Sequence, residues 1–355
     1  MLFYNTNVIQ NDLEFIVNTN LNYEKFRNKT VLITGINGMI ATNLTFLFMY
    51  LNDNLNYNIS VIGLGRNKSE FKSRFGEESK KISFIEQDVN DEIKIKQKVD
   101  YIFHAATNAS PENMVDHPVS IAMVNTLGTI NVAKFALKNN AHLHFLSTRE
   151  IYGYSSNNEI LEDDVSILNS IDIRNVYPIS KMSAESILLA FKEEYNLSIS
   201  ISRIAHAYGP GMKLQNDGRV MADFLGKTIK NENIILNSDG TAERAFIYTR
   251  DAILGILFIV LEHSEGNFTF NLSNEQEPIM VKDLAYLIKN CGKLFGLNNE
   301  VIFLSDQSVQ GYSKIIRTPL STKKLRSLGW SPTVSLENGI NSTLNVYNEL
   351  KEIKY

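Results

Sequence analysis

Cysteine is almost absent from this chain. Cys291 is the single cysteine among 355 residues, so the chain cannot form an intramolecular disulfide or a metal site made of thiolates. Such sparse use of cysteine is typical of proteins from a reducing compartment. We therefore expect a cytoplasmic protein that holds no metal.

The chain also lacks a strong excess of charge of either sign. Its 35 basic and 39 acidic residues give a formal net charge of −4, so no net field draws the protein toward a polyanion. We therefore expect no nucleic acid among its partners.

Long apolar runs are missing as well. The longest run, Ala252–Leu261, has ten residues, about half of the ~20 that a membrane-spanning helix needs, and it predicts a buried helix. The N-terminal residues show no basic segment followed by an apolar one, as a secretion signal would. We expect neither a secretion signal nor a membrane partner.

The chain is rich in the regular alternation of an α/β protein. Hydrophobic residues make up 44% and charged residues 21% of the sequence, close to the averages for globular domains. From Lys29 onward, short apolar runs alternate with longer helical stretches, which predicts a doubly wound parallel sheet of the Rossmann class. The expected strands are Thr30–Thr34, Ile59–Leu64, Ile82–Ile85, Tyr101–Ala105, His142–Ser147 and Leu197–Ile204.

The alternation becomes less regular after Gly209, which predicts a second, smaller lobe. Residues 29–208 would form the dinucleotide-binding domain. Residues 209–355 would mainly form a substrate-binding lobe, with part of 240–265 returning to the first domain. Residues 1–28 precede the first strand, and the spacing of their apolar side chains predicts a helical extension packed on the core.

The first expected strand leads directly into a turn that contains glycines. Gly35 and Gly38 stand where the backbone must turn tightly and approach a pyrophosphate at the start of the next helix, and Ala41 takes the third glycine position. We therefore predict a dinucleotide site at this junction. Its cofactor-binding candidates are Gly35, Asn37, Gly38, Met39 and Ile40.

The second expected strand ends in Gly65-Arg66, without the carboxylate that many NAD sites offer to the adenosine ribose. Arg66 could pair with a ribose 2′-phosphate, which favours NADP, or lie in solvent as a surface arginine, which leaves NAD. Asp88, after the third strand, is placed to accept a hydrogen bond from the adenine amino group. The expected cofactor is NAD or NADP.

Tyr177 and Lys181 are four residues apart, hence on one face of an expected helix. An ammonium beside a phenol favours the phenolate, so we expect Lys181 to lower the pKa of Tyr177 and let it take a proton from a sugar hydroxyl. Thr148 and Glu150 follow the fifth expected strand, at the sheet edge where doubly wound folds place their sites.

His142 and His144 alternate along the fifth expected strand and could face the same side. Two histidines without a third ligand nearby are more often structural residues than metal ligands. We therefore interpret them as structural.

Together these motifs resemble the extended short-chain dehydrogenase/reductase family, and within it the nucleotide-sugar epimerases, dehydratases and decarboxylases. The resemblance spans most of residues 29–340, and the closest likeness is to UDP-glucuronate decarboxylases. GDP-mannose 4,6-dehydratases also carry Thr-x-Glu at the fifth strand. The matching segments are TGINGMIA from Thr34, HAAT from His104, NTLGT from Asn125, STREIYG from Ser147, YPISK from Tyr177, AYGPG from Ala207, DGRV from Asp217, RAFIYTRDA from Arg244 and LGWSP around Trp330.

The resemblance implies a role for each matching residue. Tyr177 would deprotonate the sugar 4-hydroxyl, Lys181 would hold the nicotinamide ribose, and Thr148 would hydrogen-bond the 4-hydroxyl. Glu150 would act beside carbons 5 and 6. The cofactor would also be bound by Arg66, Asp88, Val89, Ala105, Ala106 and Asn125, and the substrate by Ser110, Arg149, Arg174, His206, Arg219 and Arg244.

The implied reaction oxidises carbon 4 of a nucleotide sugar and proceeds through a 4-keto intermediate. A carboxylate at carbon 6 would then be lost as carbon dioxide, and dehydration and epimerisation are the alternatives. Four departures from the decarboxylase pattern leave the sugar open: Arg66, Met114, Arg149 and His206 replace an acid, a tyrosine, a serine and an asparagine. A sensor that binds the cofactor without catalysis is an alternative of another class. The resemblance also implies a homodimer formed through helices.

Overall fold

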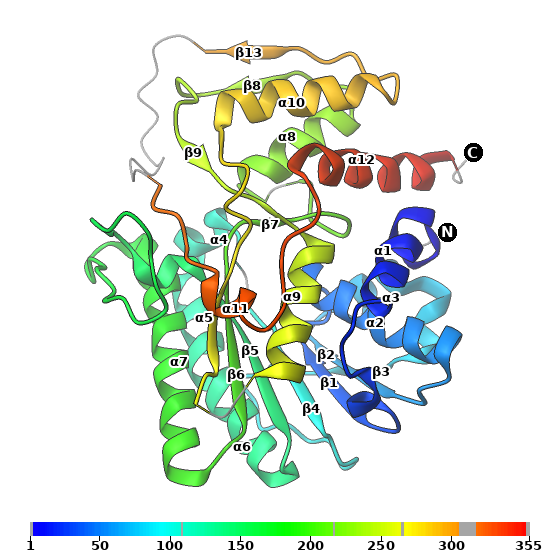
Figure 1. Ribbon diagram of the computed structural model, residues 1–355, viewed down its shortest axis with the longest axis vertical. Helices are drawn as coiled ribbons and strands as arrows, with labels where there is room; N and C mark the ends of the chain where they lie inside the picture. Colours follow the sequence, from blue (N-terminus) through cyan, green and yellow to red (C-terminus); the bar gives the residue numbers. More distant parts are fainter. Residues whose placement is uncertain (1–2, 108, 216, 264–265, 305–316, 353–355) are drawn as a thin grey trace.

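The computed structural model describes residues 3–107, 109–215, 217–263, 266–304 and 317–352 (Figure 1). Seven parallel strands form one sheet in the order β3-β2-β1-β4-β5-β6-β11. The order changes direction between β1 and β4, as in dinucleotide-binding sheets, which confirms the predicted fold class. The strands are β1 (Thr30–Thr34), β2 (Ser60–Gly65), β3 (Ser83–Glu86), β4 (Tyr101–His104), β5 (His142–Thr148), β6 (Ile199–Ile204) and β11 (Thr269–Leu272).

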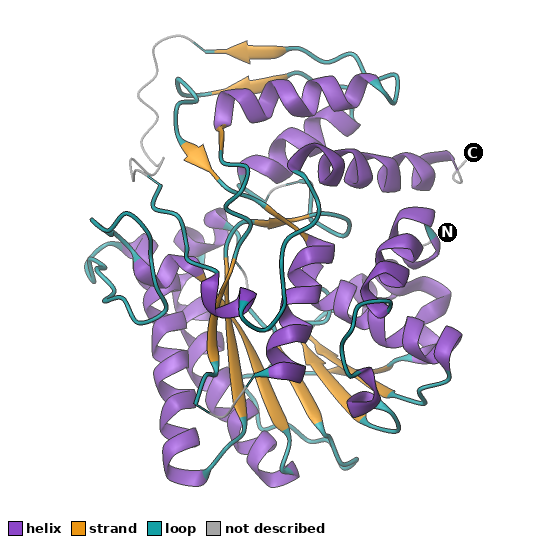
Figure 2. Ribbon diagram, in the orientation of Figure 1, coloured by secondary structure: helices purple, strands orange, loops and turns teal. Residues whose placement is uncertain are grey.

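Helices cover both faces of the sheet (Figure 2). Successive strand residues point to opposite faces, so Val31 and Ile33 of β1 pack in one core and Leu32 packs in the other. All of β1 is therefore buried, as expected for a strand between two helical layers. The first core contains α1 (Asn7–Val17), α2 (Met39–Leu55) and α9 (Thr249–Glu262), and the second contains α6 (Thr129–Asn139) and α7 (Val176–Tyr195).

The sequence predicts six of these strands, with bounds shifted by at most two residues, and misses β11. This strand pairs with β6 at the edge of the sheet. Asparagine is a poor strand former, yet Asn271 lies fully buried in β11 and accepts a 2.6 Å hydrogen bond from the Tyr152 hydroxyl. A tertiary contact thus stabilises a strand that its own sequence does not indicate.

His142 and His144 of β5 alternate with three serines of the neighbouring segment. His142 bonds Ser198 and Ser200, both at 2.8 Å, and His144 bonds Ser200 at 2.8 Å and Ser202 at 3.1 Å. Burial lowers the pKa of His142 to about 3 and that of His144 well below its usual value, so both rings are neutral. This histidine–serine ladder uses all four ring nitrogens inside the sheet and confirms the structural interpretation.

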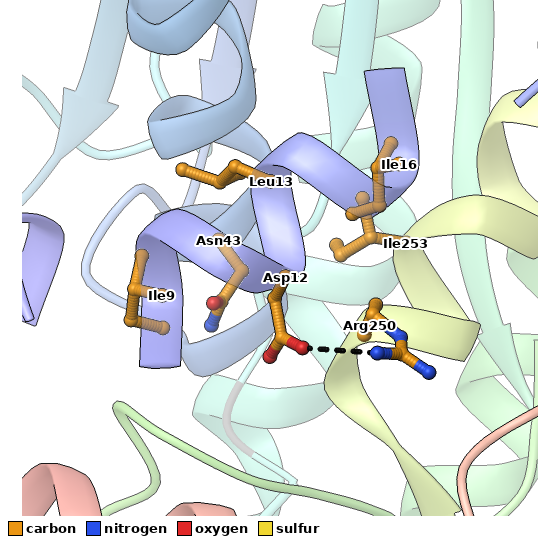
Figure 3. Close-up of a pocket in the computed structure, with 7 residues that line it drawn as sticks. All are labelled: Ile9, Asp12, Leu13, Ile16, Asn43, Arg250 and Ile253. Carbon is orange, nitrogen blue, oxygen red and sulfur yellow. Dashed lines mark hydrogen bonds and ion pairs between the residues drawn. The ribbon is translucent and has the colours of Figure 1, made fainter. Parts of the chain in front are cut away.

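The N-terminal helix α1 packs on α9 around one buried polar contact (Figure 3). Asp12 accepts a 2.8 Å hydrogen bond from the Tyr248 hydroxyl, and its other oxygen lies 3.4 Å from Nη1 of Arg250. Burial raises the pKa of Asp12 to about 6. The predicted helix is confirmed, and its buried apolar residues are Ile9, Leu13 and Ile16.

The chain after Gly209 contributes to both halves of the molecule. A smaller core, which includes the buried free thiol of Cys291, lies above the sheet in Figure 1. The buried helix α9 and Trp330 pack instead in the first core of the sheet. The domain bounds expected from the sequence stay predictions, as does the cytoplasmic location. The smaller core is built from α8 (Val220–Ile229), α10 (Val281–Lys293), α12 (Leu336–Glu352), β8 (Ile234–Leu236) and β13 (Val301–Phe303).

Other short α-helices and strands are α3 (Lys68–Phe75), α4 (Pro111–Asp116), α5 (Pro118–Met123), α11 (Lys323–Arg326), β7 (Ala207–Tyr208), β9 (Glu243–Arg244), β10 (Ile247–Tyr248) and β12 (Ile279–Met280).

Within the described residues, one helical stretch is long and apolar enough to cross a membrane by length and composition. It is Pro118–Asn139, which comprises α5, a π-helical turn (Val124–Gly128) and α6. Half of its apolar window is buried in the fold. A core helix passes the same test, so the stretch is weak support for a membrane span.

Candidate active site

The glycine turn lies where the strand order changes direction. Gly35 follows β1 with a φ of +65°, and a Cβ at this position would lie 2.7 Å from the carbonyl oxygen of Ala105, just after β4. A side chain is therefore excluded here. Gly38 caps α2, and Met39 and Ile40 begin it, so the N–H groups of this first turn have no partner within the helix. Dinucleotide-binding folds hold a pyrophosphate at such a helix end.

Three buried side-chain oxygens in the expected cofactor-binding region lack hydrogen-bond partners in the described part of the chain. Asn37 Oδ1, Thr107 Oγ1 and Asn125 Oδ1 are buried and make no hydrogen bond to the described residues. Asn125 lies in the π-helical turn, a distortion often found at functional sites, and its amide nitrogen donates to Ser180 at 2.9 Å. Buried polar groups are rarely left unpaired, so this region, which includes Ala106, fits a dinucleotide that would supply the missing partners.

Arg66 and Asp88 lie together at the ends of β2 and β3. Arg66 Nη1 is 3.6 Å from Asp88 Oδ2, and the Arg66 side chain is 61% exposed, so water screens this ion pair. Asp88 also accepts a 2.9 Å hydrogen bond from the backbone N–H of Asn90. Val89 is buried against Gly128 of the π-helical turn. The predicted contacts of the adenosine half are thus adjacent.

The carboxyl end of β5 lies against α7. Lys181 Nζ donates a 2.7 Å hydrogen bond to the carbonyl oxygen of Leu146, and the Thr148 side chain is a polar neighbour of Tyr177 that acts to lower its pKa. Tyr177, Lys181 and Thr148 are all buried. The structure therefore brings three of the predicted catalytic side chains together.

The pKa of Tyr177 differs from the prediction. Burial raises this pKa above its usual value of 10, the negative charge of Glu150 raises it further, and Thr148 and Arg219 act to lower it. Burial also lowers the pKa of Lys181 to about 7. The expected lowering of the Tyr177 pKa is therefore not seen, because burial of the phenol and the charge of Glu150 outweigh the effects of Thr148 and Arg219.

Glu150 is the carboxylate at the centre of the site. The residue is exposed to solvent, yet the protein packed around its carboxyl raises its pKa, and the positive charges of Arg174, Arg149, Arg244 and Arg219 act to lower it. Arg149 lies in the same turn and Arg174 just before α7, whereas Arg219 caps α8 and Arg244 ends β9. The fold thus gathers positive charge from four segments around one acid.

The arginines of this cluster differ in their partners. Arg219 forms an ion pair with Asp217, whose Oδ2 lies 2.7 Å from Nη2. Arg149 and Arg244 each donate to a backbone carbonyl oxygen, at 3.2 and 2.7 Å. A carbonyl does not neutralise a guanidinium, and burial lowers the pKa of both side chains. These two charges are therefore suited to an anionic ligand.

The other predicted substrate residues border the same region. His206 follows β6 with a φ of +42°, and burial, helped by the surrounding arginines, lowers its pKa to about 3, so the ring is neutral. Ser110 is buried just before α4. Met114 of that helix packs in one cluster with Tyr177.

A cavity of about 540 Å³ lies next to the arginine cluster, in the smaller lobe. Asp217, the partner of Arg219, is part of its wall. Both polar and apolar side chains from α8, β8 and the adjoining loops line it, among them Gln215, Phe224, Leu236, Asn237 and Ser238. Its size suits a group of several rings.

Sequence reasoning missed two residues of this region. Arg317 donates to the carboxylates of Glu243, at 2.8 Å, and Glu275, and so joins the smaller lobe to the loop after β11. No motif marks Arg317. Glu185 is buried four residues after Lys181, and this spacing on one helix face could have revealed it.

Among the described residues, no group of three or more histidine, cysteine, aspartate and glutamate side chains is placed to hold a metal ion. The sheet order, the glycine turn and the placement of Tyr177 and Lys181 of α7 against the carboxyl end of β5 instead define a dinucleotide-binding protein of the Rossmann class. The chain belongs to the NAD dependent epimerase/dehydratase family, whose model matches residues 31–273. This confirms the resemblance seen in the sequence.

Individual relatives and solved structures show which enzymes the chain is similar to. UDP-glucuronic acid decarboxylase 1 of Xenopus tropicalis is 31% identical over 330 residues, which cover 92% of this chain and 73% of the relative. The crystal structure of UDP-glucose 4-epimerase from Thermotoga maritima, with UDP-glucose, has a TM-score of 0.77 and 24% identity, and covers 91% of this chain and 99% of that one. UDP-glucuronic acid 4-epimerase from Bacillus cereus, in complex with UDP-glucuronic acid and NAD, has a TM-score of 0.74 and 21% identity, and covers 90% and 99%. At this level of sequence identity, the two structural similarities show that the fold is shared and nothing more.

Proposed function

We propose that the protein oxidises carbon 4 of a nucleotide sugar, works through a 4-keto intermediate and releases the carboxylate of carbon 6 as carbon dioxide. The observation that carries this proposal is the placement of Thr148 as a polar neighbour of the buried Tyr177, beside a solvent-accessible Glu150 on which four arginines act. The 31% identity to a UDP-glucuronic acid decarboxylase favours decarboxylation over dehydration and epimerisation.

Each protein group has a distinct task in this reaction. Bound NAD or NADP would accept the hydride from carbon 4 and return it. Tyr177 takes the proton of the 4-hydroxyl, Thr148 orients that hydroxyl, and Lys181 places positive charge beside the phenol. The substrate is then a β-keto acid, so the bond between carbons 5 and 6 breaks and carbon dioxide leaves. Glu150 delivers the proton that carbon 5 takes up.

The charges and the space of the site support an anionic nucleotide sugar. The guanidinium groups of Arg149 and Arg244, bonded only to carbonyl oxygens in the described part of the chain, match a diphosphate and a sugar carboxylate. The cavity beside Arg219 would take the nucleoside. Glu150 and Tyr177 would then face the sugar.

A panel of nucleotide sugars tests the proposal. The purified protein is incubated with UDP-glucuronate, UDP-glucose, GDP-mannose and dTDP-glucose in the presence of NAD or NADP, and products are followed by mass spectrometry. We expect UDP-glucuronate to lose the mass of carbon dioxide. Loss of water would identify a dehydratase, and a new isomer of unchanged mass an epimerase. Tight cofactor binding with no conversion of any sugar would favour a sensor.

Arg66 tests the choice of cofactor. We expect it to pair with the 2′-phosphate of NADP, because its exposed side chain ends only 3.6 Å from Asp88 at the adenosine end of the site. A charge-assisted hydrogen bond is worth ~1.5 to 3 kcal/mol, so Arg66→Ala should weaken NADP by about 10- to 100-fold and leave NAD unchanged. Calorimetric titration measures both. Lys68→Ala removes a neighbouring positive charge as a control. Equal effects on the two cofactors would make Arg66 a surface residue and leave NAD as the cofactor.

We also propose that the protein is a homodimer formed through α5 and α7. Val119, Met123 and Leu127 follow one another at intervals of four residues and are exposed, as is Leu189 on α7, which packs on α5. Such an apolar row suits burial against a second copy. Met123→Glu combined with Leu127→Glu should convert dimer to monomer in sedimentation velocity. Leu294→Glu, at an exposed leucine of the smaller lobe, should not. A monomeric unsubstituted protein at micromolar concentration would contradict the proposal.

A further inference from the structure

Three consecutive residues of β5 each lie beside one side chain of α7. The three side chains are spaced by four residues and therefore lie on one face of the helix. Lys181 donates to the Leu146 carbonyl and the Ser147 hydroxyl donates to Glu185, while the Thr148 side chain is a polar neighbour of Tyr177. The reaction proposed above assigns roles to Lys181 and Tyr177 but none to Glu185.

Glu185 is a buried carboxylate with a fixed orientation. The Ser147 hydroxyl donates to its Oε1, and Arg203 of β6 donates to it through Nε at 3.1 Å and Nη2 at 2.7 Å. Arg203 is itself held, because its Nη1 donates to the Tyr152 hydroxyl at 2.7 Å and to the Glu162 carbonyl oxygen at 2.6 Å. A two-point guanidinium contact stabilises a carboxylate in its charged form. The position of this negative charge is thus set by two strands.

Lys181 lies one helical turn before this carboxylate, on the same face of α7. Burial lowers the pKa of Lys181 to about 7, and Glu185 is the group that opposes this shift. The other titratable groups around it are Tyr177 on α7 and His104 on β4. Tyr177 is a neutral phenol because burial raises its pKa, and His104 is a neutral ring because burial lowers its pKa to about 3. The ring of Phe145, 4.4 Å from Nζ, adds a cation–π contact.

We propose that Glu185, fixed by Ser147 and Arg203, is a positioning residue that favours the ammonium form of the Lys181 side chain near neutral pH. The inference rests on the proposed function, in which Lys181 acts as a cation beside Tyr177. Glu185 would thereby set the upper pH limit of the reaction without touching the substrate or the cofactor.

The test measures the protonation of Lys181 directly. Glu185→Gln keeps the size of the side chain and an oxygen for Ser147 but removes the charge. The titration midpoint of Lys181 is followed by ¹³C NMR of the lysine Cε atoms, and its signal is assigned by its loss in Lys181→Met. A neighbouring opposite charge typically shifts a pKa by about one unit or more. We expect the midpoint to fall by about one pH unit in Glu185→Gln and to stay in place in Glu185→Asp.

Glu162→Gln is the matched control, because it removes a carboxylate from the same hydrogen-bond network while Arg203 contacts only its backbone carbonyl. It should leave the Lys181 midpoint unchanged. If Glu185→Gln does not fold, Glu185→Met combined with Arg203→Met removes the whole buried pair, a change that proteins often tolerate. This double variant should lower the midpoint as well.

Activity gives an independent readout. The alkaline limb of the pH profile of kcat should move down by the same one unit in Glu185→Gln, which is about a tenfold loss of kcat at alkaline pH and little loss below about pH 5. An unchanged Lys181 midpoint in every charge-removing variant would overturn the inference, whatever the activity. A lowered midpoint in a protein that converts no nucleotide sugar would support the electrostatic role of Glu185 and contradict the proposed function instead.

Discussion

Tyr177→Phe should abolish turnover and leave cofactor binding intact. The substitution removes only the phenolic oxygen, which has Thr148 as a polar neighbour and which takes the proton from the substrate in the proposed reaction. A general base typically contributes ~10² to 10⁴ in rate, so kcat should fall by at least about 100-fold. Steady-state kinetics with the converted nucleotide sugar, together with calorimetric titration of the cofactor, measures the two effects separately.

Tyr101→Phe is the matched control for this experiment. Tyr101 begins β4, at the opposite end of the sheet from the site, and its hydroxyl donates to the backbone oxygen of Lys25 at 3.3 Å. Loss of this hydroxyl should leave kcat unchanged. Full activity in Tyr177→Phe would remove Tyr177 from the mechanism and leave the position of the base unknown.

Glu150→Gln should separate the hydride step from the steps that follow it. The amide keeps the size of the carboxylate and its capacity for hydrogen bonds, but it cannot deliver a proton to carbon 5. The 4-keto group should therefore form at a normal rate, whereas the later step should slow by about 100-fold or more. In stopped-flow measurements with UDP-glucuronate, the absorbance of the reduced cofactor should rise quickly and persist.

A double variant shows whether the accumulated species depends on the redox residues. Tyr177→Phe combined with Glu150→Gln should give no reduced cofactor at all, because the oxidation no longer occurs. If Glu150 merely supports the fold beside Arg149 and Arg174, the single variant should lose both steps together and melt at a lower temperature. No reduced cofactor would then accumulate, and the acid/base role of Glu150 would be withdrawn.

The sequence was sufficient for the parts of the fold that depend on local patterns. Strand β1 and the glycine turn follow from an apolar run and from Gly35, whose positive φ and contact with Ala105 exclude a side chain. Strand β11 was missed because its polar residue Asn271 is stabilised by Tyr152, more than one hundred residues earlier. Patterns within a short window cannot contain such a contact.

In the candidate site, too, the sequence predicted what depends on local spacing and did not predict what depends on contacts between distant residues. Tyr177 and Lys181 share a helix face, so their spacing alone placed them together. The sign of the Tyr177 pKa shift could not be predicted, because it depends on how deeply the phenol is buried. Arg317 was missed for a related reason: it acts through Glu243 and Glu275, which are distant in the chain.

The histidine–serine ladder between β5 and β6 has a consequence for how the chain finds its native register. These strands are parallel and joined through α7, so no tight turn fixes their alignment. A slip of two residues would keep the same faces buried, but it would place one ring nitrogen opposite Ile204 or leave Ser202 without histidine, at about 1 to 3 kcal/mol for each lost buried bond. It would also move Arg203 by about 7 Å relative to Ser147. The ladder therefore selects, during folding, the one alignment in which Arg203 reaches Glu185.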